Sequence, residues 1–329
     1  MKRQRRNFLH LAAGALALPA VSRLAWAQAY PTRPITVIVP FPAGGPADTV
    51  ARIVSERMRA TLGQPIIVEN VAGANGSLGV SRAVRASADG YTLIAGTLTT
   101  HVLIGALYPL QYDLLSDFKP VALLADGPLL LVAKKTTAAN DLKELLAWLK
   151  ANPDRASQGT AGVAAIEHIA GILFQKQTDT RFQQVPYRGN APAMQDLVAG
   201  QIDMMFVDAT TALAHVQAGR IKAYAVAGKT RLAAAPSIPT VDEAGLPGFY
   251  AALWYGLWAP AQTAQDVVAK LNAAAMEALA EPTVRQRLAD LGQQIVPPGQ
   301  QSPDALGAFQ KAEIDKWWPI VKEAGIKAE

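Results

Sequence analysis

The feature that most constrains this chain is a junction of an apolar strand, a glycine-rich turn and a helix over residues 35–62. The sequence ITVIVPF at 35–41 predicts a buried strand. PAGGP follows at 42–46, and apolar side chains then recur at helical spacing from Val50 to Leu62. A strand that turns directly into a helix directs backbone N–H groups and the positive end of the helix dipole at one place. The sequence therefore predicts an anion-binding site at this turn.

A nucleotide phosphate is not the anion that this turn indicates. A P-loop requires Lys and then Ser or Thr after its last glycine, whereas Gly45 is followed by Pro46, Ala47 and Asp48. No G-x-G-x-x-G motif follows a predicted strand either. A carboxylate is the natural small anion that remains.

The first 27 residues have the features of an export signal. Basic residues at positions 2–6 precede an apolar run from Phe8 to Val21, and AWA at 25–27 forms a cleavage site. The order RRNFL resembles the twin-arginine type of signal, whose cargo is usually exported folded. The apolar run contains His10 and Pro19 and is shorter than the roughly 20 residues that a membrane anchor needs. We expect cleavage after Ala27 and a periplasmic location.

Charge and cysteine content exclude several classes of partner. The chain has 31 basic and 26 acidic residues, but five of the basic residues lie in the export segment, which leaves 26 of each. A formally neutral surface has no general attraction for nucleic acid or anionic lipid. The chain has no Cys, so neither a lipoprotein anchor nor a structural disulfide is expected. We expect a monomer that is not embedded in a membrane and binds no nucleic acid.

Short apolar runs alternate with helical patterns through most of the chain. Strands are predicted over residues 65–71, 92–97, 120–125, 129–134, 182–187, 202–208 and 221–228. Repeated strand–helix units predict an α/β fold with parallel sheets. After Trp254 the pattern becomes mostly helical, with helices over 264–280, from Pro282, and from Pro303 behind a Ser302 cap.

The length of the chain predicts two lobes. Removal of 27 residues from 329 leaves 302, which exceeds the usual size of one domain. We expect residues 28–126 and 255–329 to form lobe 1 and residues 127–254 to form lobe 2, with crossings near Asp126 and Trp254. Two crossings would make a two-segment hinge, and the cleft between the lobes would be the default ligand site.

Groups suited to catalysis are few. The His residues outside the export segment, His101, His168 and His215, are widely spaced, so no motif such as H-E-x-x-H is present. GSLG at 76–79 approaches a nucleophile elbow, but Asn75 stands where G-x-S-x-G requires glycine. A hydrolase would need a Ser or Thr that pairs with His168 in space. We expect no catalytic residue, no metal and no cofactor, and an envelope hydrolase stays as the weaker alternative.

Further loops could contribute polar groups to a cleft. GANGS at 73–77 and GTLTT at 96–100 follow predicted strands of lobe 1 and supply N–H groups and hydroxyls. GTAG at 159–162, followed by a helix from about Ala164, and YRGN at 187–190 do so from lobe 2. Two sets of loops from opposite lobes would close on one ligand.

Each of these residues also has a structural interpretation. Glycines at strand ends often form turns, and threonines often cap helices. The Asp48 carboxylate could bind an ammonium group of the ligand, but stabilisation of the positive end of the helix dipole is its favoured role. His168 is more often structural, and Arg188 could pair with a distal carboxylate or remain solvated. Phe41 and Trp254 could line the pocket or belong to the core.

Several separate motifs occur in one order along the chain: PFPAGGPAD at 40–48, DGYTL at 89–93, VPYRGNAP at 185–192, AGQIDMMF at 199–206 and IPTVDEAG at 238–245. With them the sequence resembles the receptors of tripartite tricarboxylate transporters, the Bug-type periplasmic solute-binding proteins. The resemblance implies an α/β, two-lobed periplasmic binding protein of the type II-like Venus-flytrap kind. Such a protein has two parallel-rich sheets with flanking helices and a two-segment hinge. It closes on a small carboxylate and delivers it to membrane transporter subunits.

The resemblance also implies how the ligand is held. In the family, backbone N–H groups of two first-lobe loops grip one ligand carboxylate, and waters bridge the remainder; residues 41–45 and 73–76 resemble these loops. The second-lobe loop usually reads G-[ST]-x-G-x-G-[ST], then two residues and His. This chain keeps most of that motif but has Ala164 and Ala165 where the second glycine and the hydroxyl are expected. A more apolar wall favours an aromatic or less hydrated acid over a tricarboxylate.

The sequence thus predicts an extracytoplasmic solute-binding protein that captures a small carboxylate, aromatic or dicarboxylic, for a tripartite tricarboxylate-type transporter. A receptor that presents the same acid to a sensor kinase is the alternative, because both roles need only a closed form with an exposed partner surface. The predicted ligand-binding residues are Phe41, Ala43, Gly44, Gly45, Asp48, Ala74, Asn75, Gly76, Thr97, Thr99, Thr100, Gly159, Thr160, Ala161, Ala165, His168, Tyr187, Arg188, Gly189 and Asp208.

Overall fold

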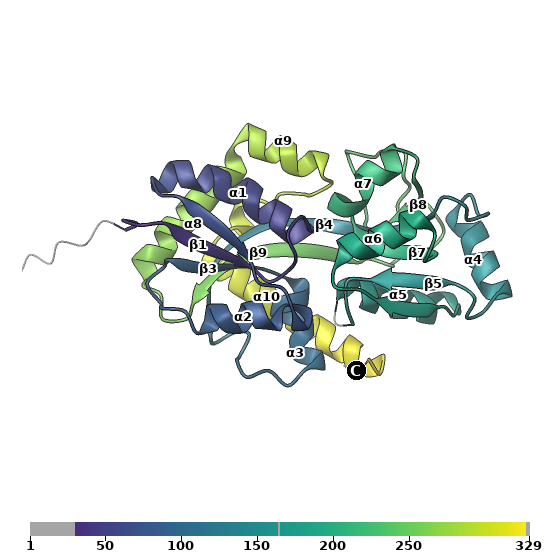
Figure 1. Cartoon of the computed structure of the whole chain (residues 1–329), viewed down its shortest axis with the longest axis horizontal. Helices are drawn as coiled ribbons and strands as arrows, with labels where there is room; N and C mark the ends of the chain where they lie inside the picture. Colours follow the sequence, from purple (N-terminus) through teal and green to yellow (C-terminus); the bar gives the residue numbers. More distant parts are fainter. Residues whose placement is uncertain (1–29, 164, 327–329) are drawn as a thin grey trace, which may run out of the picture.

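The protein consists of two α/β lobes that lie side by side and are joined by long strands (Figure 1). The structure is a computed structural model and describes residues 30–163 and 165–326. The predicted export segment, residues 1–27, and Ala164 lie outside the described residues.

Lobe 1 is built around three parallel strands in the order β2-β1-β3, namely β1 (Ile35–Val39), β2 (Ile66–Asn70) and β3 (Thr92–Thr97). Its helical segments are α1 (Pro46–Leu62), η1 (Ala74–Gly76), α2 (Ser77–Val84), η2 (Thr99–Leu103), α3 (Ile104–Leu107), α8 (Gln265–Ala280), α9 (Pro282–Asp290), η3 (Pro298–Gln300) and α10 (Pro303–Glu323). The predicted starts at Pro282 and Pro303 are confirmed, and the Ser302 side chain accepts a hydrogen bond from the Ala305 N–H at 3.1 Å.

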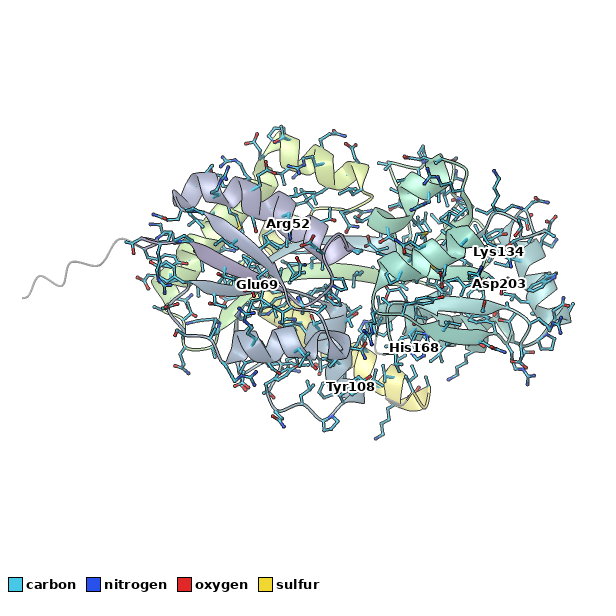
Figure 2. The ribbon with its side chains drawn as sticks, in the orientation of Figure 1. Arg52, Glu69, Tyr108, Lys134, His168 and Asp203 are labelled. Atoms are coloured by element: carbon cyan, nitrogen blue, oxygen red, sulfur yellow. The ribbon has the colours of Figure 1, made fainter. Side chains whose placement is uncertain are left out.

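Lobe 2 contains β5 (Ser157–Thr160), which is parallel to both of its neighbours, β6 (Gln183–Pro186) and β7 (Met204–Asp208). The other elements are β8 (Ile221–Val226) and the helices α4 (Leu142–Ala151), α5 (Ile166–Thr178), α6 (Asn190–Ala199) and α7 (Ala209–Gln217). An ion pair of 2.7 Å between Lys134 and Asp203 lies in this lobe, away from lobe 1 (Figure 2).

Two antiparallel strands, β4 (Phe118–Lys134) and β9 (Ala252–Pro260), run from one lobe into the other. Within lobe 1, β9 pairs with β3, and within lobe 2, β4 pairs with β7 and β8. At the junction Asp126 lies opposite Trp254 and Gly127 opposite Leu253. The sheet that results is mixed, with parallel pairs toward its outer strands and antiparallel pairs around β4 and β9.

Two details of the sequence prediction are wrong at this junction. The strands predicted over 120–125 and 129–134 are a single strand, because Asp-Gly-Pro at 126–128 interrupts the apolar pattern but keeps its pairing with β9. The chain after Trp254 does not turn helical at once, since β9 continues to Pro260.

A buried aromatic pair ties η2, β9 and α10 together. The rings of His101 and Trp258 are stacked with centroids 3.9 Å apart. Gln310 of α10 accepts from the Trp258 Nε1–H at 3.0 Å and donates to the His101 carbonyl at 3.0 Å. Burial lowers the pKa of His101 to about 3, so the ring is neutral. The packing leaves room only for glycine at position 96.

We expect Gly96→Ala to lower the free energy of unfolding by about 1–3 kcal/mol, the range for overpacking in a core. A Cβ at this position would lie 2.1 Å from the His101 ring, which is held against Trp258. Chemical denaturation measures the change. Gly299→Ala is the control, because its Cβ would meet no atom within 4 Å. Equal stability of the two variants would contradict the packing argument.

Candidate functional site

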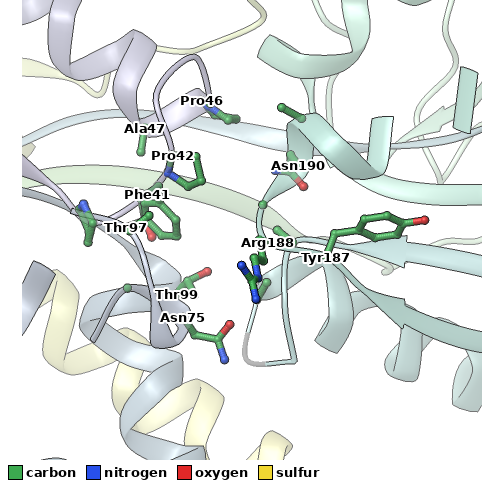
Figure 3. A pocket seen from close by; sticks show the side chains of 18 of the residues that line it. Phe41, Pro42, Pro46, Ala47, Asn75, Thr97, Thr99, Tyr187, Arg188 and Asn190 are labelled. Carbon is green, nitrogen blue, oxygen red and sulfur yellow. The ribbon is translucent and has the colours of Figure 1, made fainter. Parts of the chain in front are cut away.

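A cavity of about 580 Å³ lies between the lobes, within the size range of small-molecule sites (Figure 3). Its walls come from the loops after β1, β2 and β3 in lobe 1 and after β5 and β6 in lobe 2. The predicted residues that line it are Phe41, Ala43, Gly45, Ala74, Asn75, Gly76, Thr97, Thr99, Ala161, Ala165, Tyr187, Arg188 and Gly189.

The loop after β1 presents the start of α1 to this cavity. Gly45 is the N-cap residue, and Pro46 occupies the first turn. N–H groups in this turn have no partner inside the helix, so proline, which has no N–H, costs no intrahelical hydrogen bond there. Pro46 and Ala47 line the cavity together with Gly45. The first N–H groups of a helix have no partner inside it, and they carry the positive end of the dipole. The predicted anion-binding geometry is therefore present at this wall.

Asp48 supports that loop from behind rather than lining the cavity. Its buried carboxylate accepts hydrogen bonds from the Gly44 N–H at 2.9 Å, from Arg52 Nε at 2.9 Å and from Asn70 Nδ2 at 2.9 Å (Figure 2 shows Arg52). Asn70 also donates to the Phe41 carbonyl at 3.1 Å. The Asp48 carboxylate thus holds the backbone at Gly44 in place. This contact supports the interpretation of Asp48 as a structural residue at the start of α1.

These hydrogen bonds also fix the charge of Asp48. Burial alone raises its pKa, but the hydrogen bonds from Arg52, Gly44 and Asn70 outweigh burial and hold the pKa below the ordinary value. The carboxylate is therefore ionised at neutral pH and braces the loop without any contribution from a ligand.

The loop after β2 has an unusual backbone. Gly73, Ala74, Asn75 and Gly76 have consecutive positive φ angles of 132°, 47°, 52° and 90°. Two of the four are not glycine, and residues held in this region store strain that is typical of functional sites. The Asn75 amide donates to the Tyr108 hydroxyl at 2.8 Å, which fixes its side chain.

Two of the three threonines predicted in the loop after β3 reach the cavity. Thr97 and Thr99 line it, and the Thr97 hydroxyl is buried with no hydrogen-bond partner among the described residues. Thr100 is buried behind them, where its hydroxyl accepts from the Thr97 N–H at 3.0 Å and lies 3.0 Å from His101 Nδ1. Thr100 therefore supports the turn.

In lobe 2, Ala161 and Ala165 line the cavity, whereas Gly159 and Thr160 form the end of β5 and do not. The Thr160 hydroxyl is buried and faces its own loop. The helix begins at residue 166, two residues later than predicted. His168 is half-buried in the first turn of α5 and is not among the lining residues (Figure 2).

The loop after β6 supplies the cavity's basic group. Arg188 is exposed and extends into the space between the lobes (Figure 3). Among the described residues it makes no ion pair or hydrogen bond, so its guanidinium group is available to an anion. The neighbouring Tyr187 turns its hydroxyl away and donates to Asp196 at 2.6 Å.

Asp208, also predicted to bind ligand, lies outside the cavity. It is fully buried where β7 meets the crossing strands and accepts from the Tyr255 hydroxyl at 2.8 Å. Gln293 Nε2 donates to both of its oxygens at 3.1 Å, and the Thr210 N–H donates at 2.8 Å. Asp208 is thus a structural link between the lobes and does not line the cavity.

Glu167 is the main residue of the cavity that the sequence prediction missed. It lies in the first turn of α5, lines the cavity and is only 2% exposed. Burial raises its pKa to about 7, against a hydrogen bond of 2.8 Å from Asn190 Nδ2, and the nearby Asp208 adds to the rise. The sequence signal was its place beside the motif histidine His168.

The two lobes approach each other closely across the cavity mouth. A Cβ on Gly162 would lie 2.4 Å from Asn75 Oδ1, and one on Gly189 would lie 3.6 Å from Pro42 Cδ. Both glycines belong to lobe 2, and both neighbours belong to lobe 1. These positions allow loops of opposite lobes to meet.

The sequence matches the family described as tripartite tricarboxylate transporter family receptor over residues 50–326. The chain belongs to this family. It is 42% identical to MatC from Rhodopseudomonas palustris with bound malate, with a TM-score of 0.84 over 89% of this chain and 100% of MatC. It is 36% identical to the periplasmic binding protein BugD, with a TM-score of 0.86 over 91% of this chain and 100% of BugD. An R. palustris protein with adipate is 30% identical, with a TM-score of 0.87 over 91% of this chain and 99% of that protein.

These similarities confirm the predicted family and fold class of the receptor. Its homologues are periplasmic binding receptors. Within residues 30–163 and 165–326, no helix has both the length and the hydropathy to span a membrane. The same residues contain no cluster of His, Cys, Asp or Glu suited to a metal ion.

The raised pKa of Glu167 predicts how stability depends on pH. The folded protein binds its proton up to a pKa of about 7, whereas the unfolded chain releases it near 4.5, so ionisation opposes folding. Stability from this group is present below pH 4.5 and is lost as pH rises through 7, by on the order of 3 kcal/mol. Urea denaturation of wild type and Glu167→Gln between pH 4.5 and 8 measures the difference, and parallel pH curves would contradict it.

Proposed function

We propose that the protein captures a small carboxylate in the interlobe cavity and delivers it to a membrane transporter of the tripartite tricarboxylate type. The observation that carries the proposal is the meeting of three anion-attracting groups at one cavity: the start of α1, the strained turn at 73–76 and Arg188. The bound malate and adipate of two similar proteins support a carboxylate as the ligand.

The two lobes have different tasks in this proposal. Lobe 1 holds one carboxylate with backbone N–H groups of Ala47 and the 73–76 turn, because helix starts and strained turns direct N–H groups at an anion. Arg188 of lobe 2 pairs with a second anionic group at the far end. Phe41, Ala165 and Leu253 give the cavity apolar surface for the methylene or aromatic part of the acid.

Closure of the lobes provides the mechanism, and no chemical turnover is involved. We propose that lobe 1 comprises residues 28–126 and 255–329 and that lobe 2, residues 127–254, rotates about the paired strands. Closing removes water from the cavity, which strengthens hydrogen bonds between fixed N–H groups and the carboxylate. The open form releases the acid, and the ligand shifts the population toward the closed form.

The cellular setting follows from the export segment. We propose that the chain is exported as a twin-arginine substrate, is cleaved after Ala27 and acts in the periplasm as a monomer. Its neutral mature charge keeps nonspecific binding to nucleic acid low, so the anion is attracted only by the local groups of the cavity.

Native mass spectrometry of the purified mature protein, followed by thermal-shift screening, tests this function. The screen covers amino acids, aliphatic di- and tricarboxylic acids and aromatic acids. A co-purified acid, or a rise in melting temperature with one acid class, is the expected result. No shift with any carboxylate would overturn the proposal, and formation of a chemical product would favour an envelope hydrolase.

We expect Gly45→Val to weaken binding of the identified acid at least tenfold, about 1.4 kcal/mol. Its φ of −77° and ψ of 172° suit a β-branched residue, and a Cβ would lie an ordinary 3.4 Å from the Pro42 carbonyl. The fold therefore persists while the side chain enters the cavity. Titration calorimetry measures affinity, with Gly299→Val as the control for a glycine outside the cavity. Unchanged affinity would remove α1 from the site.

Gly162→Ala tests closure. The added methyl group would meet Asn75 of lobe 1, so we expect the closed form to be disfavoured and acid affinity to fall about tenfold. Gly200→Ala also has a positive φ, 79° against 138° at Gly162, and would meet no atom within 4 Å, so it is the control for a glycine replaced away from the other lobe. If both variants lose affinity equally, interlobe contact is not the cause.

A further inference from the structure

The lobe 2 wall of the cavity presents hydrogen-bond acceptors that the carboxylate-binding groups do not explain. Glu167 of α5 and Asn190 of α6 both line the cavity and are 2% and 7% exposed. The Asn190 amide nitrogen donates to Glu167 Oε1 at 2.8 Å. This leaves Asn190 Oδ1, which is buried and has no hydrogen-bond partner among the described residues.

Glu167 also lacks a compensating cation. Among the residues that the structure describes, its side chain forms no ion pair, and the side chain that donates to it is the neutral amide of Asn190. Arg188 is the basic residue that lines the cavity, but it is exposed and forms no bond with Glu167. Asp208 lies close enough to raise the pKa of Glu167 further. A second ligand carboxylate would meet repulsion at this wall unless Glu167 were protonated.

We propose that Glu167 and Asn190 form a specificity site that binds an N–H or O–H donor on the ligand. This inference rests on the proposed function, and it narrows the ligand to acids that carry an ammonium or hydroxyl group. Such a donor would reach Asn190 Oδ1, which is otherwise unpaired among the described residues, beside the Glu167 carboxyl group. The carboxylate of the same ligand stays at the lobe 1 loops.

The strength of selection follows from burial. A buried hydrogen-bond acceptor that has no donor costs free energy, whereas an exposed acceptor bonds to water and does not carry this cost. A site built to pair with a polar ligand group discriminates strongly against the analogue that lacks it, because the analogue leaves the protein groups unpaired. The methyl groups of Ala161 and Ala165 on the same wall offer no alternative acceptor side chain.

The titration of Glu167 distinguishes the two kinds of donor. The titratable groups near it are Asp208 from β7, Tyr255 from β9 and His168 beside it on α5, and Arg188 from the loop before α6 lines the same cavity. Its pKa of about 7 leaves the carboxyl partly protonated at neutral pH. A ligand ammonium group would favour the ionised form and expel that proton, whereas a hydroxyl group would not require this.

Titration calorimetry with matched acids tests the inference. Succinate, malate and aspartate share four carbons and differ in carrying no donor, a hydroxyl and an ammonium group; glutarate, 2-hydroxyglutarate and glutamate repeat the series with five carbons. We expect wild type to bind one donor-bearing acid at least tenfold more tightly than its unsubstituted analogue. Glu167→Gln should reduce that ratio to threefold or less. Glu243→Gln, an exposed glutamate of lobe 2, is the control.

The wild-type data alone also decide between the donors. Repeating the titration in buffers of different ionisation enthalpy counts the protons exchanged. Proton release near pH 7 identifies an ammonium group, and its absence with tight binding of the hydroxy acid identifies a hydroxyl group. If unsubstituted acids bind as tightly as their donor-bearing analogues, or if Glu167→Gln weakens all acids equally, the inference is overturned while the proposed function stands. Binding of no carboxylate by wild type overturns the proposed function itself.

Discussion

The antiparallel pairing of β4 with β9 is the constraint on which the two-lobed arrangement depends. β9 pairs with β3 of lobe 1, and β4 pairs with β9 on one side and with β7 and β8 of lobe 2 on the other, so the lobes are joined by a hydrogen-bonded strand ladder rather than by a flexible linker. The segment at Gln294 pairs with β4 at the junction of the lobes. The Asp126 N–H donates to the Gln294 carbonyl at 2.9 Å, and the Gln294 N–H donates to the Asp126 carbonyl at 2.7 Å. Asp208, Tyr255 and Gln293 fill the space beside it. Any rotation of one lobe against the other would therefore have to bend or twist this strand ladder.

The parts of the fold that could be predicted are those with local causes. The turn at Gly45 and Pro46 could be recognised because a strand, a glycine turn and a helix start are adjacent in sequence. The continuity of β4 could not be predicted, because the sequence at Asp126 and Gly127 is typical of a turn. Only their pairing with β9, more than a hundred residues later in the chain, shows that the strand continues. Strand β9 was missed for the same reason.

The candidate site divides in a similar way. The loops that contain Phe41, Asn75 and Arg188 follow predicted strands, and the carboxyl ends of strands are where α/β ligands bind. The burial of Glu167 could not be predicted even though it lies beside the motif histidine, because an acidic residue in the first turn of a helix normally stabilises the helix dipole from an exposed position. Only the packing of lobe 2 shows that it is buried at the cavity. The burial of Asp208 could not be predicted, because its partner Gln293 is distant in sequence.

The brace formed by Asp48, Arg52 and Asn70 has a consequence for altering the receptor. These side chains hold the 41–45 loop through contacts inside lobe 1, so the shape of the anion pocket does not depend on what occupies it. The residues of the opposite wall, including Glu167 and Arg188, do not take part in that brace. A library that randomises the lobe 2 wall but keeps Arg188 should therefore leave the lobe 1 loops and the arginine in place while it explores new side groups. The protein thus offers a starting scaffold for sensors of different organic acids.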